Sequence, residues 1–245
     1  MENNIFLTSN PSDKDAYKSI MTKTVDAIVD SVNDSRAYAG PTPQVLGSQV
    51  GNYDIFPSKG IGFDALLANL KETILPNFLR TSSTDYMAHL HSPALLETIA
   101  SELILSTFNQ SMDSWDQSPV ATEVEVAVVE KLCTMYGYNM NSSKGIIADG
   151  CFTSGGSQSN LTGITLARDW FCNNTLQHDV KKYGLPETYR KFRLYTSEIS
   201  HFSMEKSAHL LGLGYNSVVK VPVDRYQKMD TKALAQLVAK DVEEG

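Results

Sequence analysis

A glycine pair between two differently patterned segments is the first feature that could bind a ligand. Residues 153–160 read Thr-Ser-Gly-Gly-Ser-Gln-Ser-Asn, between a short apolar run and a stretch of helical spacing. Gly155 and Gly156 let backbone N–H groups approach an anion, Ser157 adds a hydroxyl donor, and a helix N-terminus adds positive potential. The loop lacks the lysine of a Walker A motif and the spacing of a dinucleotide fingerprint. It predicts a phosphate site, with a plain tight turn as the alternative.

A histidine follows directly after another predicted strand. His201 stands within the sequence Ser-Glu-Ile-Ser-His-Phe-Ser, residues 197–203. A residue at the carboxyl end of a strand in an α/β sheet projects into the crevice where ligands bind. An imidazole there can stack on a planar ring or move protons near neutral pH. Taken alone, such a histidine is more often a local hydrogen-bonding residue, but its pairing with the glycine loop favours a functional role.

Two further histidines are spaced as metal ligands often are. His89 and His91 would face the same side of an extended segment, but no third ligand follows at a suitable spacing. A pocket-lining role is therefore predicted for them, with no metal. The cysteines at 133, 151 and 172 are an odd number at wide intervals and match neither a zinc site nor a disulfide framework, which suits a reducing compartment.

The elements that carry these residues differ along the chain. The first part predicts helices over residues 13–34 and 62–79, with a turn-rich stretch at 40–47 between them. Pro76 should end or kink the second helix. A third helical face covers residues 95–109. The next helix begins either with Ser118 as N-cap or one turn later, at a capping box.

Beyond residue 145 the pattern alternates between strands and helices. Strands are predicted at 146–153, 192–197 and 218–223, and helices at 160–171, 203–211 and from Asp230 as N-cap to about residue 243. This order of elements is typical of an α/β fold with a largely parallel sheet.

Composition limits the classes of function. The chain has 245 residues, 42% of them hydrophobic, and a net charge of −7. This is an ordinary globular composition, and the acidic balance argues against nucleic acid or an anionic membrane as a partner. No apolar run approaches the roughly 20 residues that span a bilayer, and no secretory leader is present, so a cytoplasmic protein is predicted.

Four stretches, in order, resemble the group II pyridoxal-phosphate-dependent decarboxylases. They are residues 86–93, 115–125, 152–161 followed by Ala-Arg at 167–168, and 200–206. That family includes glutamate, aromatic-amino-acid and diaminobutyrate decarboxylases. The resemblance implies a fold-type-I large domain like that of pyridoxal-phosphate-dependent transferases, with pyridoxal 5′-phosphate (PLP) as cofactor.

The resemblance also implies roles for residues already singled out. Gly155, Gly156 and Ser157 would bind the cofactor phosphate, in agreement with the anion site predicted from the residues. His201 would stack on the pyridine ring as a catalytic residue. The cofactor takes up the electrons of the bond to the carboxylate as carbon dioxide leaves, while the protein positions the substrate.

The same resemblance places the substrate and the partner subunit. His89 and His91 would line the substrate entrance, and Thr122 would border the pocket. Residues 1–84 would form a helical segment that covers the other subunit of a homodimer. Residues 85–245 would form the first part of the large, cofactor-binding domain.

Two residues that the resemblance leads one to expect do not occur in the chain. The family's covalent lysine and its acidic partner for the ring nitrogen should follow well downstream of His201, and the sequence reaches Gly245 before either. Lys206 matches a helix position of the family and not this lysine. The 245-residue chain alone is therefore predicted to be catalytically inactive, with the lysine lying elsewhere.

Three interpretations stay open at this point. The first is an amino-acid decarboxylase, which residues 115–125 favour because they resemble that family in particular. The second is another fold-type-I enzyme, such as an aminotransferase or a sulfur-removing lyase. The third is a short non-catalytic relative that binds or dimerises. For a decarboxylase, a diamino acid such as L-2,4-diaminobutyrate is the favoured substrate, with glutamate, aspartate, histidine or an aromatic amino acid as alternatives.

Overall fold

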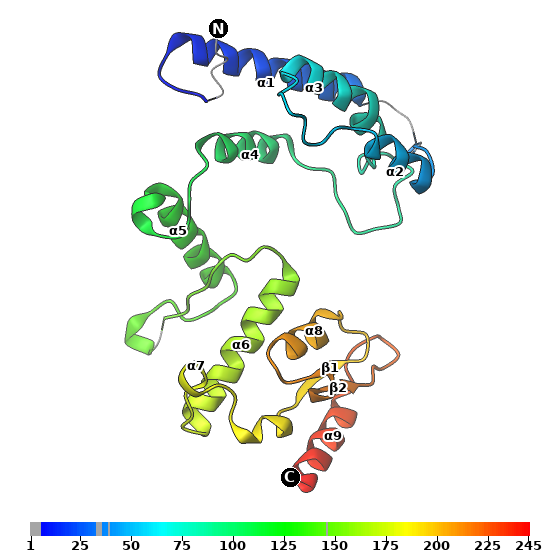
Figure 1. The fold of residues 1–245 in the computed structure, drawn as a ribbon. Coiled ribbons are helices and arrows are strands. Elements are labelled where there is room, and N and C mark those ends of the chain that lie inside the picture. The colour runs from blue at the N-terminus through cyan, green and yellow to red at the C-terminus, as the bar shows by residue number, and fades with distance from the viewer. Residues whose placement is uncertain (1–5, 33–35, 39, 146) are drawn as a thin grey trace. The chain divides into compact units, whose positions relative to one another are not determined.

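The computed structural model describes residues 6–32, 36–38, 40–145 and 147–245, and the chain forms two compact units, Met1–Asn109 and Gln110–Gly245. The first unit is helical, and the second combines helices with a small parallel sheet (Figure 1). The helices of the first unit are α1 Pro11–Ser31, α2 Pro43–Gly51, α3 Phe63–Asn69 and α4 Leu96–Phe108. The second unit contains α5 Pro119–Met135, α6 Gly156–Thr175, α7 Val180–Tyr183, β1 Leu194–Ser197, α8 Ser203–Leu210, β2 Val218–Val221 and α9 Thr231–Glu244.

Polar contacts join the helices of the first unit. Tyr17 on α1 and Thr107 on α4 share a hydrogen bond of 2.7 Å between their hydroxyl oxygens. Arg80 donates from Nη2 to the carbonyls of Ser31 at 2.8 Å and Leu75 at 3.0 Å. Because the last carbonyls of a helix lack partners within it, the guanidinium satisfies the end of α1 and fixes the following chain against it.

The predicted helix over residues 62–79 changes its winding before it ends. After α3 the chain forms a π-helical turn at Leu70–Ile74 and a 3₁₀ turn at Leu75–Asn77. Pro76 has no N–H to donate, and its ring crowds the carbonyl four residues earlier, so a regular α-helix cannot continue through it. The expected ending or kink at this proline is confirmed.

Two details of the first unit's prediction need correction or completion. The stretch at 40–47, predicted as turn-rich, contains the start of α2, because Pro43 occupies the first helical position, where its missing N–H is harmless. The helix predicted over residues 13–34 is α1, which ends at Ser31, and residues 33–34 lie outside the described residues.

The start of α5 resolves an open alternative. The helix begins at Pro119 with Ser118 as its N-cap residue, so the later capping-box start is wrong. Ser118 is fully buried, and its hydroxyl donates to the Met112 sulfur at 3.1 Å and not to the first turn of the helix.

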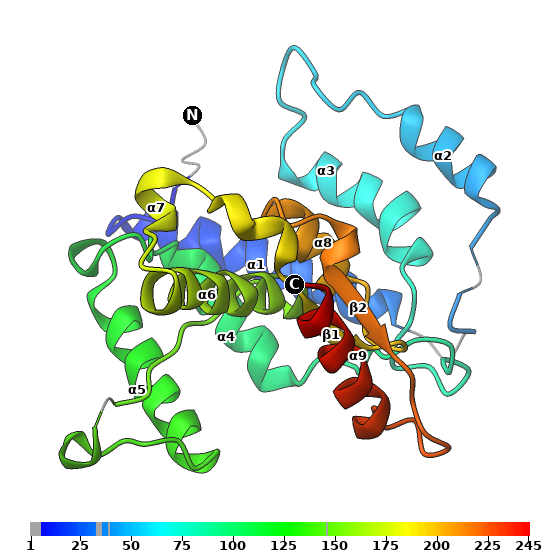
Figure 2. The ribbon, with the colours of Figure 1, turned by 90° about the horizontal axis from the view of Figure 1, so that it is seen from below.

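The second unit is built around α6 and the two-stranded sheet. β1 and β2 are parallel, with Leu194 opposite Val218 and Ser197 opposite Val221. α8 connects the two strands and packs on α6, and α9 packs beside β2 (Figures 1 and 2). Cys172, Ala208 and Val221 are completely buried here, from α6, α8 and β2 respectively.

The strand predicted at 146–153 is not observed. Residues 147–153 pair with no other strand, and residue 146 lies outside the described residues. A strand exists only where a neighbour accepts and donates its backbone hydrogen bonds, and this segment bonds elsewhere. Ala148 donates to the Asn139 carbonyl at 2.8 Å, and Phe152 donates to Glu125 Oε1 at 3.0 Å.

Candidate cofactor site

The glycine loop leads directly into α6, which starts four residues earlier than predicted. Gly155 is the N-cap residue, in extended conformation, and Gly156 is the first helical residue. Gln158 fastens the turn, because its Oε1 accepts hydrogen bonds from the backbone N–H and the hydroxyl of Ser154, at 2.8 and 2.6 Å. The loop is thus held by its own side chains ahead of the helix.

The two glycines leave open space at the helix N-terminus. A Cβ atom built on Gly155 or Gly156 meets no atom within 4 Å. The N–H groups of Gly156 and Ser157 belong to the first turn, where a helix offers no acceptor of its own. α6 is 20 residues long, so its dipole places positive potential at this end. These donors fit a phosphate group.

His201 lies between β1 and α8 and is held by a residue that begins α8. Its Nδ1 accepts a hydrogen bond from the Ser203 backbone N–H at 3.2 Å and lies 2.9 Å from the Ser203 hydroxyl. Asn160 on α6 donates from Nδ2 to that same hydroxyl at 2.8 Å. One face of the imidazole lies against Phe202, with ring centroids 4.0 Å apart. A series of hydrogen bonds therefore joins α6, the helix that follows the glycine loop, to His201.

A cavity of about 500 Å³ lies where α6 and α8 begin. Ser157 and Gln158 line it from α6, and Ser203 and Lys206 from α8. The Lys206 Nζ lies 4.3 Å from the centroid of the Phe202 ring, so the cavity is lined by a residue with a positive charge. The structure thus brings together Ser157 and the residue that holds His201.

Thr122 has a local contact only. Its hydroxyl donates to the Ser118 carbonyl at 2.8 Å, one turn earlier in the chain. Its neighbour Glu125 instead accepts from Phe152 and so ties α5 to the segment that leads into the phosphate loop. A role for Thr122 at the substrate pocket stays a prediction.

His89 and His91 lie in the first unit, in an exposed segment before α4. The Tyr86 hydroxyl is 2.8 Å from His91 Nδ1, and the two histidine ring centroids are 6.1 Å apart. Within the described ranges, no group of three or more His, Cys, Asp or Glu side chains is arranged to hold a metal ion. The pocket-lining role of this pair stays a prediction.

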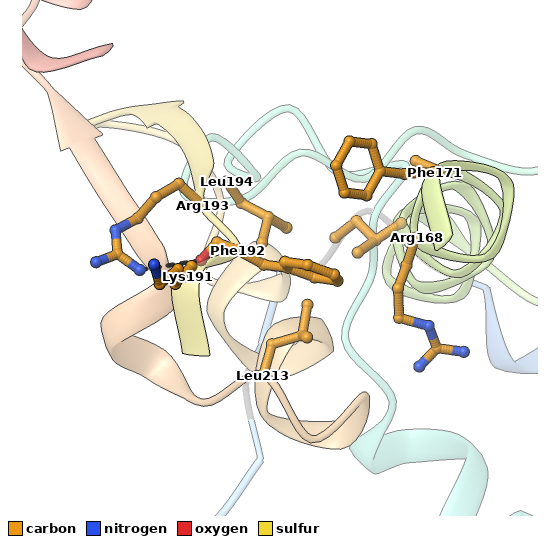
Figure 3. Close-up of a pocket in the computed structure, with 9 residues that line it drawn as sticks. Arg168, Phe171, Lys191, Phe192, Arg193, Leu194 and Leu213 are labelled. Carbon is orange, nitrogen blue, oxygen red and sulfur yellow. Dashed lines mark hydrogen bonds between the residues drawn. The ribbon is translucent and has the colours of Figure 1, made fainter. Parts of the chain in front are cut away.

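A second pocket, of about 330 Å³, lies farther along α6 (Figure 3). Phe171 and Phe192 meet edge to face within it, with centroids 5.6 Å apart. In Figure 3 the Arg168 guanidinium points away from these rings, and its Nη2 lies 2.8 Å from Asp169 Oδ1. Lys191 and Arg193 also line this pocket, but no residue of the glycine loop does, so it is separate from the candidate phosphate site.

The comparison with known families decides what this arrangement belongs to. The model of the pyridoxal-dependent decarboxylase conserved domain matches residues 52–245. The chain belongs to this family. The resemblance seen in the four sequence stretches is confirmed.

The relatives of this family member are amino-acid decarboxylases. The chain is 34% identical over 231 residues to L-2,4-diaminobutyrate decarboxylase of Acinetobacter baumannii, covering 91% of this chain and 44% of that protein. It is 32% identical over 229 residues to the enzyme of the same name from Rhizobium meliloti (strain 1021), covering 93% and 42%. The chain thus spans less than half the length of these curated relatives.

A solved structure shows the same fold. The glutamate decarboxylase domain of diaminobutyrate-pyruvate transaminase and L-2,4-diaminobutyrate decarboxylase from Vibrio parahaemolyticus aligns with a TM-score of 0.90 and 34% identity, covering 98% of this chain and 51% of that chain. The prediction of part of a fold-type-I α/β domain with a helical N-terminal extension is confirmed. In the described part of this family member, no helix is long and apolar enough to cross a membrane. The cytoplasmic location stays a prediction.

Sequence reasoning missed the residues that connect the site. Asn160, Ser203 and Gln158 hold the loop and His201, yet none was singled out. Asn160 lies one helical turn before Ile164 on α6, and both side chains are half-buried. A polar residue on the buried face of a helix was therefore the available signal.

Proposed function

We propose that this chain supplies the cofactor-binding part of a PLP-dependent decarboxylase that converts an amino acid to an amine, with L-2,4-diaminobutyrate as substrate. The observation that carries the proposal is the link between the phosphate loop and His201 through Asn160 and Ser203. Family membership and the two diaminobutyrate decarboxylases among the relatives support the cofactor and the substrate.

The phosphate of PLP binds at the N-terminus of α6 in this proposal. The N–H groups of Gly156 and Ser157 and the Ser157 hydroxyl donate to its oxygens, and Gly155 keeps the approach free of side chains. The charge-assisted bonds and the helix dipole favour a dianion over a neutral group.

His201 holds the ring of the cofactor from one side. His201 would pack on the pyridine ring of bound PLP, and Ser203 keeps the imidazole from turning. Bound PLP supplies the electron sink that allows the bond between Cα and the carboxylate to break. The carboxylate would leave as carbon dioxide and a proton would replace it on Cα, so a diamino acid would yield a diamine.

The remaining proposed roles fall on residues away from the glycine loop and His201. His89 and His91 line the substrate entrance, and Thr122 borders the pocket. Residues 1–84 pack on a second subunit of a homodimer, and residues 85–245 belong to the large domain. The covalent lysine lies outside this chain, so the chain alone is inactive.

The test is an assay of the intact protein after reconstitution with PLP. Release of carbon dioxide is measured with L-2,4-diaminobutyrate, glutamate, aspartate, histidine and an aromatic amino acid. We expect turnover of the diamino acid and formation of diaminopropane. If the protein decarboxylates another of these amino acids but not L-2,4-diaminobutyrate, the proposed substrate is wrong.

A protein that binds PLP but releases carbon dioxide from none of these substrates would contradict the decarboxylase. Amino-group transfer to a 2-oxo acid in that protein would favour the aminotransferase alternative. Failure to bind PLP would favour the non-catalytic relative. Size measurement of the intact protein tests the dimer, and a monomer at working concentration would contradict it.

A further inference from the structure

We propose that Ser203, oriented by Asn160, is a positioning residue that fixes His201 as the tautomer with its proton on Nε2. The role of this tautomer in holding the cofactor rests on the proposed function. The tautomer itself follows from the contacts of the protein alone and can be measured without cofactor.

The backbone contact of the His201 ring places its proton. A backbone N–H can only donate, and that of Ser203 points to Nδ1 at 3.2 Å. A neutral imidazole has one accepting nitrogen and one N–H. Nδ1 is therefore the acceptor, and the proton is on Nε2.

The directions of the other two hydrogen bonds follow from that of the backbone bond. The Ser203 hydroxyl lies 2.9 Å from the same Nδ1, which already accepts, so the hydroxyl must donate. The oxygen then has lone pairs left, and the Asn160 amide donates to one of them at 2.8 Å. Amide, hydroxyl and imidazole thus form one directed chain, in which each bond strengthens the next.

Burial keeps these three hydrogen-bonded groups in one arrangement. Ser203 is only 2% exposed, so its hydroxyl cannot exchange its partners freely with water. A buried hydroxyl that loses a partner is destabilised, which keeps the three groups in one arrangement. The arrangement joins α6 to α8, so the loop for the phosphate and the imidazole for the ring are set relative to each other.

The decisive variant is Asn160→Asp, which has nearly the same shape but accepts hydrogen bonds only. The Ser203 hydroxyl then turns to donate to the new carboxylate, and Nδ1 loses its hydroxyl donor. Ser203→Ala removes that donor directly. For each variant we expect the ratio of the Nδ1–H to the Nε2–H tautomer to rise about tenfold, which corresponds to about 1.4 kcal/mol, the size of one hydrogen bond.

The measurement is solid-state ¹⁵N NMR of the intact, cofactor-free protein labelled at histidine. The His201 signals are assigned as those missing from the spectrum of His201→Gln. Asn174→Asp is the matched control, because Asn174 also lies on α6 but its amide donates to the Trp170 carbonyl at 2.9 Å. We expect this control to leave the tautomer ratio unchanged, and the double variant of Asn160 and Ser203 to equal Ser203→Ala alone.

Cofactor affinity shows whether Asn160 and Ser203 position His201 for binding or only stabilise the fold. Affinity for PLP and for pyridoxal, which lacks the phosphate, should fall by the same factor, about fivefold to tenfold, in Asn160→Asp, because the change acts on the ring. The proposed tautomer is wrong if the unchanged protein carries the proton on Nδ1. It is also wrong if the ratio of the two tautomers stays the same in both variants. A moved ratio with unchanged affinities overturns the positioning role. If the unchanged protein binds no PLP, the proposed function fails while the tautomer result still stands.

Discussion

Tyr195 on β1 donates a hydrogen bond to Asp241 on α9, with 2.6 Å between the phenol oxygen and Oδ2. Arg193 Nε lies 3.7 Å from the same carboxylate oxygen. Burial, followed by the hydrogen bond to Asp241, raises the pKa of Tyr195 to about 12. The neutral phenol of Tyr195 thus joins α9 to the sheet by a hydrogen bond. Only the protonated phenol can donate this bond.

Tyr195→Phe should lower the free energy of unfolding by about 1 to 2 kcal/mol at neutral pH, because the hydrogen bond to a carboxylate is lost. The stabilising contribution is complete below the phenol's unfolded pKa of about 10 and disappears as the pH rises through about 12. Urea unfolding at pH 8 and at increasing alkaline pH checks this. The free energies of unfolding of the two proteins should become equal at the alkaline end. A constant difference between them across this range would contradict a stabilising role of the protonated phenol.

Ser157→Ala should weaken PLP binding about tenfold to a hundredfold, because one charge-assisted donor to the phosphate is removed. Pyridoxal, without the phosphate, should bind equally well to both proteins. Titration followed by absorbance of the bound cofactor measures both affinities. Ser101→Ala is the control, since that exposed hydroxyl donates to the Glu97 carbonyl within α4. Equal loss of affinity for both ligands would argue against a phosphate contact.

Asp230→Ala should destabilise the protein by about 1 kcal/mol through loss of a helix cap. Asp230 Oδ1 accepts from the backbone N–H groups of Lys232 at 2.8 Å and Ala233 at 3.2 Å, at the start of α9. Asp230→Asn is the control, because asparagine caps a helix about as well. Thermal unfolding of both variants checks the difference, and equal destabilisation would show that charge and not capping matters.

Thiol reactivity should separate the cysteines of this chain. Cys151 is exposed, whereas Cys172 is completely buried and its pKa is raised by that burial. Since the thiolate is the reactive form, an aromatic disulfide reagent at pH 8 should modify Cys151 quickly and Cys172 only on unfolding. Cys151→Ser should remove the fast phase. A fast phase that persists in this variant and vanishes in Cys172→Ser would contradict the burial.

Local patterns predicted most of the helices in this chain. Ser118 with Pro119 and Asp230 with its following residues are start signals carried by neighbours in sequence, and α5 and α9 begin where these signals indicate. The glycine loop before α6 was likewise predictable, because a turn that glycines form between two differently patterned segments needs no distant partner. These features could be predicted because their energetics are local.

Contacts between distant residues could not be predicted in this way. Residues 147–153 have the composition of a strand but are unpaired, since pairing depends on a neighbouring strand and not on propensity. The bond from Asn160 to Ser203 spans 43 residues, and only the packing of α8 on α6 brings the two side chains together.

The sequence by itself determined the family, and it singled out Gly155, Gly156 and His201 as candidates for the cofactor site. Residue types and short spacings carry these features. Only the tertiary structure decided how His201 is held and which of its nitrogens accepts. The direction of a hydrogen bond depends on which groups meet in a buried place, and that meeting is set by the fold.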